Sequence, residues 1–151
     1  MKKIRLVIYI ILVSFFLNFA WEFLQSPFYD CFKNTLESNY KHYLLAIIGD
    51  SAYTVLIYFI LSIINKDFLW AVNSFNMKNL YISIGLWLIL AIFIEYKWVF
   101  LLNKWVYSDL MPILFWIWII PLIQMMILPL MSFKISVIFL NYKPEKIKNK
   151  F

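Results

Sequence analysis

The feature that most constrains the fold is a set of four apolar runs of roughly 20 residues each, separated by short polar connections. The runs cover residues 4–24, 43–64, 80–100 and 113–133. A helix of that length crosses the hydrocarbon core of a bilayer and satisfies its own backbone hydrogen bonds there. The sequence therefore predicts an all-α polytopic membrane protein, a four-helix transmembrane bundle. We expect it to form one domain over residues 1–151, with a polar C-terminal tail at 141–151.

Composition agrees with lipid as the main solvent of this chain. Hydrophobic residues make up 64% of it and charged residues 15%, against roughly half and a quarter in soluble domains. The first run follows Lys2, Lys3 and Arg5, an arrangement that a secretory signal peptide shares. Because Asn18-Phe19-Ala20 is a poor cleavage site, we expect an uncleaved first helix.

The basic residues are distributed unevenly along the chain. The formal charge is +6, but ten of the 14 Lys and Arg residues lie in the two ends and in the connection between the second and third runs. The first and third connections, with the adjoining ends of the runs, hold the other four. This pattern is typical of the positive-inside rule and argues against nucleic-acid binding. We predict that both termini are cytoplasmic, in a multi-pass protein of a bacterial inner membrane.

Polar residues interrupt the apolar runs at related depths. Asn18, Glu22 and Gln25 are spaced i, i+4, i+7, so they share one face of a helix. Alternating helix directions put Glu22 and Glu95 near the outer ends of their runs. At 1.5 Å per residue, Asp50 then lies about 10 Å and Gln124 about 16 Å below the outer ends of theirs. All of the intramembrane acids therefore fall in the outer half of the bilayer, which predicts one polar cluster there.

Ionisable residues inside a membrane span are costly, and by default they indicate function. We predict that three acids are catalytic: Glu22, Asp50 and Glu95. Residues of the same cluster and of the adjoining connections are predicted to bind substrate: Asn18, Trp21, Gln25, Tyr53, Trp105, Tyr107, Ser108 and Gln124. The sequence indicates no set of metal ligands and identifies no cofactor.

Each of these residues has a simpler alternative. Glu22 and Glu95 could reach the interface and only mark helix ends. Asp50 could make a structural hydrogen bond between helices. Trp98, Trp105 and Tyr107 could belong only to an interfacial aromatic belt, and for Trp98 that is the better explanation. His42 is better explained as a loop residue than as a metal ligand.

Several motifs are spread over all four runs: Asn18-x-x-Trp21-Glu22-x-x-Gln25-x-Pro27-x-Tyr29, Gly49-Asp50, Glu95, Trp105-x-Tyr107-Ser108-x-x-Met111-Pro112, and Pro121-x-x-Gln124 with Pro129. In these motifs the chain resembles a family of small four-span bacterial membrane proteins. The resemblance implies the four-span architecture and the same polar residues, but no reaction, since that family has no established activity.

A weaker resemblance connects the chain with membrane carotenoid cyclases and related terpene cyclases. It rests on Glu95, Trp105-x-Tyr107 and Pro121-x-x-Gln124. Those enzymes carry an acid at the position of Gln124, where it protonates an alkene. The glutamine argues against the same chemistry in this chain.

Three functions remain open. The first is an enzyme acting on a lipid-like or isoprenoid substrate, in which Glu22 and Asp50 serve as general acid and base and Glu95 orients them. The second is a proton- or cation-coupled transport or binding protein. The third is a structural or assembly subunit whose polar stripe bonds a partner's helices. The corresponding partners are membrane lipid, an apolar small molecule, a second copy of the chain or another membrane protein.

Overall fold

The computed structural model describes residues 1–30, 36–103, 106–114 and 117–142. Its four long helices are α1 (Lys2–Gln25), α2 (Leu36–Ile64), α4 (Met77–Glu95) and α5 (Ile119–Asn141). Each is, with its flanking helical residues, long and apolar enough to cross a membrane. The predicted all-α, four-helix bundle of a multi-pass membrane protein is therefore confirmed. The side of the membrane on which the termini lie stays a prediction.

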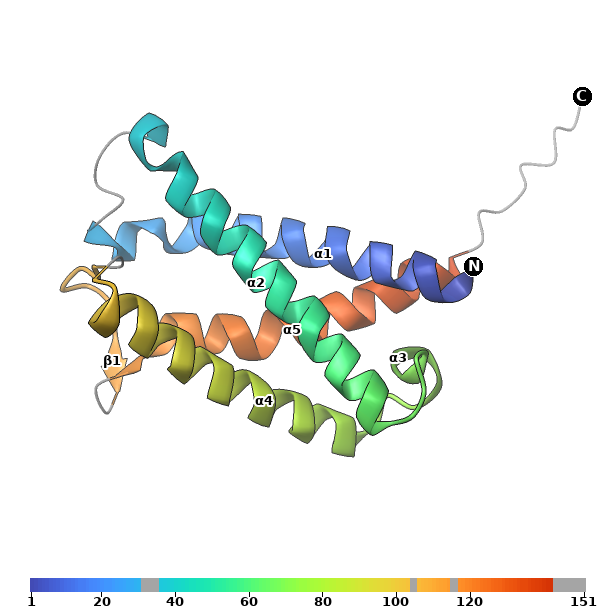
Figure 1. The fold of residues 1–151 in the computed structure, drawn as a ribbon. Coiled ribbons are helices and arrows are strands. Elements are labelled where there is room, and N and C mark those ends of the chain that lie inside the picture. The colour runs from blue at the N-terminus through green and yellow to red at the C-terminus, as the bar shows by residue number, and fades with distance from the viewer. Residues whose placement is uncertain (31–35, 104–105, 115–116, 143–151) are drawn as a thin grey trace, which may run out of the picture.

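The helices pack as alternating, oppositely directed rods (Figure 1). α1 packs along both α2 and α5, and α4 packs mainly along α5. The start of α1 and the end of α5 lie together at one end of the bundle, beside the short helix α3 (Trp70–Asn73). We call this the terminal end. The opposite end carries the two short strands that precede α5, and we call it the hairpin end.

α1 stops where the sequence predicts. Ser26 and Pro27 follow its last residue, Gln25, and belong to the short 3₁₀ helix η1 (Ser26–Phe28). Proline lacks a backbone donor and disfavours helix in the residue before it, so the α-helical hydrogen bonds cannot continue through this point. The chain turns extended at Tyr29, which pairs with Tyr107 across an isolated antiparallel bridge.

The fourth long helix lies later in the chain than the run at 113–133 indicates. Strands β1 (Ile113–Leu114) and β2 (Ile117–Trp118) form a small antiparallel pair, and α5 begins only at Ile119. The Ile119 amide donates to the carbonyl of Pro112 at 3.1 Å. β-Branched and aromatic residues favour strands, and a proline is tolerated in the first turn of a helix. Pro121 therefore lies in the first turn of α5.

An aromatic cluster closes the terminal end of the bundle. Trp70 of α3 is fully buried, with ring centroids 5.7 Å from Tyr58 of α2 and 5.5 Å from Phe133 of α5. The Tyr58 hydroxyl donates to the carbonyl of Phe68, and the Trp70 indole donates to the carbonyl of Tyr58. These contacts attach the connection between α2 and α4 to α2 and α5.

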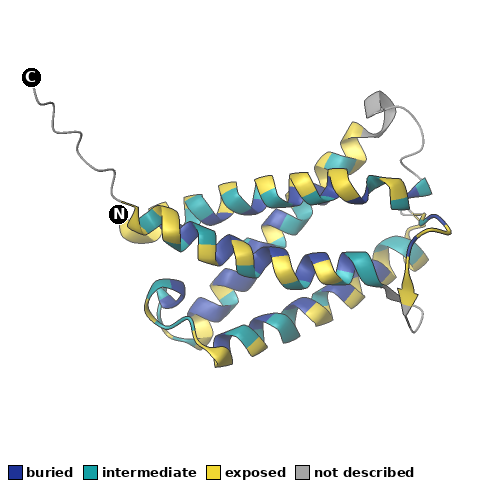
Figure 2. Cartoon of the chain, turned by 180° about the vertical axis from the view of Figure 1, so that it is seen from behind, coloured by how far each residue is buried: buried dark blue, intermediate teal, exposed yellow. Residues whose placement is uncertain are grey.

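Many exposed positions on the helices carry large apolar side chains, unlike the exposed positions of a soluble bundle, and Figure 2 shows where the exposed positions lie. Large apolar side chains such as Phe16, Phe23 and Ile89 are more than half exposed, at 65%, 60% and 67%. Polar side chains on the same helices, such as Ser14 and Glu22, are buried. Apolar surface on this scale needs an apolar solvent, which lipid supplies.

Asp67, in the connection before α3, gives a pH-dependent prediction. Its carboxylate accepts hydrogen bonds from Asn73 Nδ2 at 2.9 Å and from the Leu69 amide at 2.8 Å. These bonds lower the pKa of Asp67 below its usual 3.8. A lowered pKa stabilises the fold above the unfolded-state pKa, and that stabilisation is lost as the pH falls through the folded-state value.

We therefore expect Asp67→Asn to lower the thermal unfolding temperature in detergent at neutral pH. The difference from the native chain should shrink as the pH falls below about 4. The exposed Asp109, changed to asparagine, serves as the control and should leave the transition unchanged. A difference for Asp67→Asn that stays constant from neutral to acid pH would contradict this assignment.

Candidate carboxylate site

The polar residues of all four long helices meet toward the hairpin end of the bundle. Glu22 lies in the last turn of α1, and Glu95 is the last residue of α4, just before the π-helical segment η3 (Tyr96–Leu101). Asp50 comes from the middle of α2, and Gln124 from the second turn of α5. Because neighbouring helices run in opposite directions, these positions coincide in depth although they are far apart in the sequence.

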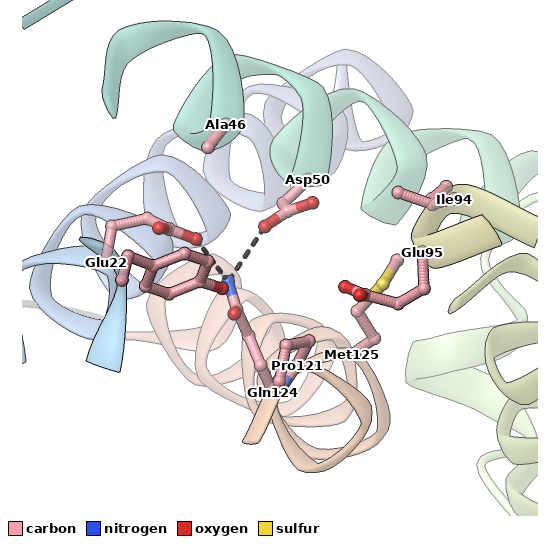
Figure 3. Close-up of a pocket in the computed structure, with 9 residues that line it drawn as sticks. Glu22, Ala46, Asp50, Ile94, Glu95, Pro121, Gln124 and Met125 are labelled. Carbon is pink, nitrogen blue, oxygen red and sulfur yellow. Dashed lines mark hydrogen bonds between the residues drawn. The ribbon is translucent and has the colours of Figure 1, made fainter. Parts of the chain in front are cut away.

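Gln124 is the centre of this arrangement (Figure 3). Its side-chain nitrogen donates to Asp50 Oδ2 at 2.8 Å, Glu22 Oε1 at 3.0 Å and Asn18 Oδ1 at 3.1 Å. An amide nitrogen has two hydrogens, so three acceptors share two donors. One amide therefore holds the two acids and Asn18 within a single hydrogen-bonded group. A proton on one of the two carboxyl groups would supply the third donor.

Glu95 points into the same space from α4 but bonds elsewhere (Figure 3). The Tyr107 hydroxyl lies 2.8 Å from Glu95 Oε1 and 2.7 Å from Oε2, so one phenol donates to both oxygens of the carboxyl group. Burial, followed by the neighbouring Tyr29 and Glu95, raises the pKa of Tyr107 far above its usual 10.0. The Tyr107 hydroxyl therefore keeps its proton near neutral pH and donates it in the hydrogen bond to Glu95.

Tyr29 lies beside this pair, with its ring tilted by 44° to that of Tyr107. Its ring centroid lies 4.7 Å from that of Tyr107, and the two residues also pair through their backbones. Burial first, and then the charges of Glu22 and Glu95, raise the pKa of Tyr29 well above 10.0. The segment after α1 and the segment after η3 are therefore joined directly over the acids.

A small cavity lies between the three acids. Its volume is about 20 Å³, and its walls are formed by Glu22, Tyr29, Ala46, Asp50, Ile94, Glu95, Pro121, Gln124 and Met125. A cavity of this size holds roughly one water molecule. Its described walls contain no lysine, arginine or histidine, so no side-chain cation faces the acids there. In the described part of the chain, no three His, Cys, Asp or Glu residues are grouped closely enough to hold a metal ion.

A larger groove adjoins this cavity between α2 and α4. It measures about 360 Å³ and is lined by Leu45, Ala46, Gly49, Asp50, Ala52, Tyr53, Ile94 and Trp98. Ala46, Asp50 and Ile94 belong to both the cavity and the groove. Asp50 therefore forms part of the wall between a mainly apolar groove and the group of acids.

The predicted site residues fall into two sets. Asn18, Glu22, Asp50 and Gln124 form one hydrogen-bonded group, and Glu95 with Tyr107 lies beside it, while Tyr53 lines the groove. Of the other predicted residues that the structure describes, Trp21, Gln25 and Ser108 do not line the cavity.

Trp21 donates its indole N–H to Gln25 at 2.9 Å, and both line a separate apolar pocket with residues of α5. Ser108 is buried at the hairpin end, where its amide donates to the carbonyl of Phe28 and its hydroxyl has no partner in the described chain. Trp105 lies outside the described residues. His42 is exposed, but it lies in α2 (Leu36–Ile64), so the expectation that it is a loop residue is wrong.

The sequence analysis did not assign Tyr29 to the site. Tyr29 is buried, with 5% of its side chain exposed, and it lines the cavity. The signal was present, because the motif Gln25-x-Pro27-x-Tyr29 ends on this residue. Trp98, expected in an interfacial belt, lines the groove.

Comparisons with known proteins give no relative for this arrangement. No family model matches the chain, and no match was found among the curated proteins or the solved structures. The function must therefore be argued from the geometry alone.

Removal of the Tyr107 hydroxyl tests the bond to Glu95. Tyr107→Phe leaves the Glu95 carboxyl group buried without its donor, so we expect a loss of about 1–2 kcal/mol in the free energy of unfolding. Reversible denaturation in mixed micelles measures this loss. Tyr81→Phe, at a tyrosine that is 66% exposed, should have no effect. Equal stability of the two variants would mean that the bond contributes nothing.

Proposed function

We propose that the protein is an inner-membrane enzyme that acts on a lipid-like or isoprenoid molecule by acid–base chemistry. The supporting observation is that Asp50 lies on both the cavity of acids and the groove between α2 and α4. The substrate's apolar part would occupy the groove, and its reacting atom would approach Asp50. The groove's volume of about 360 Å³ is within the usual range for small-molecule sites.

The roles of the acids follow from what each one contacts. Among the described residues that line the groove, Asp50 is the only acid, so it is the group placed to exchange a proton with the substrate. Glu22 shares the Gln124 amide with Asp50, which makes it the natural second holder of that proton. Glu95, which accepts hydrogen bonds from the Tyr107 hydroxyl, adds a third carboxyl group beside them, charged or neutral according to whether it holds a proton.

The walls of the groove favour a substrate that develops positive charge. Tyr53 and Trp98 both line it, and aromatic faces attract cations. Three acids with no basic side chain in the described cavity wall also favour positive charge. A proton-transfer reaction with a cationic intermediate suits this lining better than one with an anionic intermediate.

The predicted topology places this site near the outer surface of the inner membrane. It rests on the excess of basic residues in the termini and in the connection between α2 and α4. With the termini in the cytoplasm, the hairpin end faces outward.

Purified protein in vesicles of bacterial polar lipids with added geranylgeraniol tests the proposal. Mass spectrometry of the extracted lipids should detect a species consumed, and a product formed, by the native chain. The double variant Glu22→Gln/Asp50→Asn should form no product. Identical lipid profiles for the native chain and the double variant would exclude acid–base catalysis on these lipids.

A proton-coupled transport function is the second candidate, favoured by the size of the cavity. The cavity of about 20 Å³ accommodates one water molecule or one hydronium ion, and it excludes any larger cargo from the space between the acids. Vesicle flux measurements separate the two functions, because a transporter moves protons without changing any lipid.

A further inference from the structure

A second set of buried polar groups lies on α4 and α5, toward the terminal end. Buried hydroxyls on the membrane-spanning helices generally donate to a carbonyl of their own helix, as Ser51 of α2 does to Ile47 and Ser132 of α5 does to Leu128, both at 2.7 Å. Ser83 and Ser136 differ. Both are fully buried, and their hydroxyls have no hydrogen-bond partner in the described chain.

The two hydroxyls lie at the same depth. α4 and α5 run in opposite directions, and Glu95 and Gln124 line the same cavity. Ser83 precedes Glu95 by twelve residues, and Ser136 follows Gln124 by twelve. Twelve residues of helix span about 18 Å at 1.5 Å per residue. Ser83 and Ser136 therefore lie level with each other, about 18 Å from the acids.

Two more unpartnered atoms flank Ser83 on the same face of α4. Asn79 Oδ1 is one helical turn nearer the terminal end, and Trp87 Nε1 is one turn nearer the acids. Both residues are 1% exposed. Asn79 Oδ1 accepts, the Trp87 indole donates, and a serine hydroxyl does both. Buried polar groups of this kind are normally satisfied by bound water, which makes two to four hydrogen bonds.

Polar groups on α1 lie at the depths between Trp87 and the acids. Ser14 is fully buried, and its carbonyl accepts from Asn18 Nδ2 at 2.9 Å. Asn18 Oδ1 in turn accepts from Gln124. Ser14 lies eight residues before Glu22, about 12 Å along α1. Trp87 likewise lies eight residues before Glu95 on α4, so Ser14 and Trp87 are at a similar depth.

We propose that Ser83, Ser136, Asn79 and Trp87 bind a file of water molecules between α4 and α5 that carries protons between the terminal end and the carboxylate cavity. A proton enters as hydronium and passes from water to water. The last hydronium protonates a carboxylate, giving a carboxylic acid and water, and the reverse steps return the proton. This inference rests on the acid–base role of the acids but not on the substrate.

Carbodiimide labelling measures the proton supply without a substrate. Dicyclohexylcarbodiimide partitions into membranes and reacts with protonated carboxyl groups, and mass spectrometry locates the product on Glu22, Asp50 or Glu95. The protein is reconstituted with one orientation, and the pH is set separately on the two sides. Tyr29 is the one other titratable residue in the described cavity wall, and the Tyr107 hydroxyl bonds Glu95 beside it.

We expect the labelling rate of the native chain to follow the pH on the side of the termini, rising up to about tenfold per unit of acidification. The double variant Ser83→Ala/Ser136→Ala should lose this dependence. Ser83→Thr/Ser136→Thr, which keeps both hydroxyls, should retain it. Ser132→Ala is the matched control on α5, because its hydroxyl is already bonded within its own helix, and it should behave as the native chain does.

Two results would overturn the inference. One is labelling of the native chain that follows only the pH on the opposite side. The other is a double alanine variant that keeps the full dependence on the side of the termini. Either can occur whether or not lipid conversion is observed, so this test fails independently of the proposed enzyme function.

Discussion

Asp50→Asn is expected to lower the rate of lipid conversion at least about 100-fold, because a positioned general acid or base contributes about 10²–10⁴ to a rate. The asparagine side chain has nearly the same shape, and its oxygen can still accept the hydrogen bond from Gln124. The fold should therefore survive while proton exchange with the substrate is lost. Rates measured in lipid vesicles, with helix content checked by circular dichroism, give the comparison.

Glu22→Gln separates the two acids. Glu22 lines the cavity but not the groove, so it can pass a proton to Asp50 without touching the substrate. We expect a smaller loss for this variant, about tenfold, with a changed dependence of the rate on pH. Asp109→Asn, at an exposed position, is the control for both variants. An Asp50→Asn variant within twofold of the native rate would exclude Asp50 as the acid or base.

The meeting of the acids could be predicted because depth in a helical bundle follows from counting residues. Each residue adds 1.5 Å along a helix, and consecutive spans alternate in direction. That was sufficient to place Glu22, Asp50, Glu95 and Gln124 toward the same end of the bundle. The rotation of α1 was also predictable, since the i, i+4, i+7 spacing of Asn18, Glu22 and Gln25 puts them on one face, and all three are buried.

The hydrogen-bond partners could not be predicted in the same way. Gln124 bonds Glu22 and Asp50, whereas Glu95 bonds Tyr107, and the choice depends on side-chain positions to within an ångström. Counting residues gives depth to no better than a turn of helix. Tyr107 also lies on a connecting segment, and its position depends on pairing with Tyr29, far away in the sequence.

The start of α5 was missed for a different reason. Residues 113–118 are continuously apolar, and such a run fits a buried strand or the start of a helix equally well. Length favoured the helix, and the β-branched and aromatic content favoured the strand. The short antiparallel pair of β1 and β2 settles the matter, and it leaves Pro121 in the first turn of α5.

Gln124→Met is expected to cause the largest loss of stability among single changes in the site, about 2–4 kcal/mol in the free energy of unfolding. Methionine is an unbranched side chain of similar length, so packing is largely kept while both amide donors disappear. Asn18, Glu22 and Asp50 then lose their shared donor together. Buried acceptors without partners cost far more than a lost hydrogen bond whose partners reach water.

A double-mutant cycle in mixed micelles identifies the cause of that loss. If Gln124 acts through the acids, Glu22→Gln should cost less in the Gln124→Met background than alone, with a coupling of about 1 kcal/mol or more. The pair Gln124→Met and Asp67→Asn should be additive, because Asp67 lies at the terminal end and shares no partner with Gln124. Additivity of the first pair as well would mean that Gln124 stabilises the bundle by packing alone. The acids would then be held in place by their own helices, and the Gln124 amide would have no part in the proton exchange between Glu22 and Asp50.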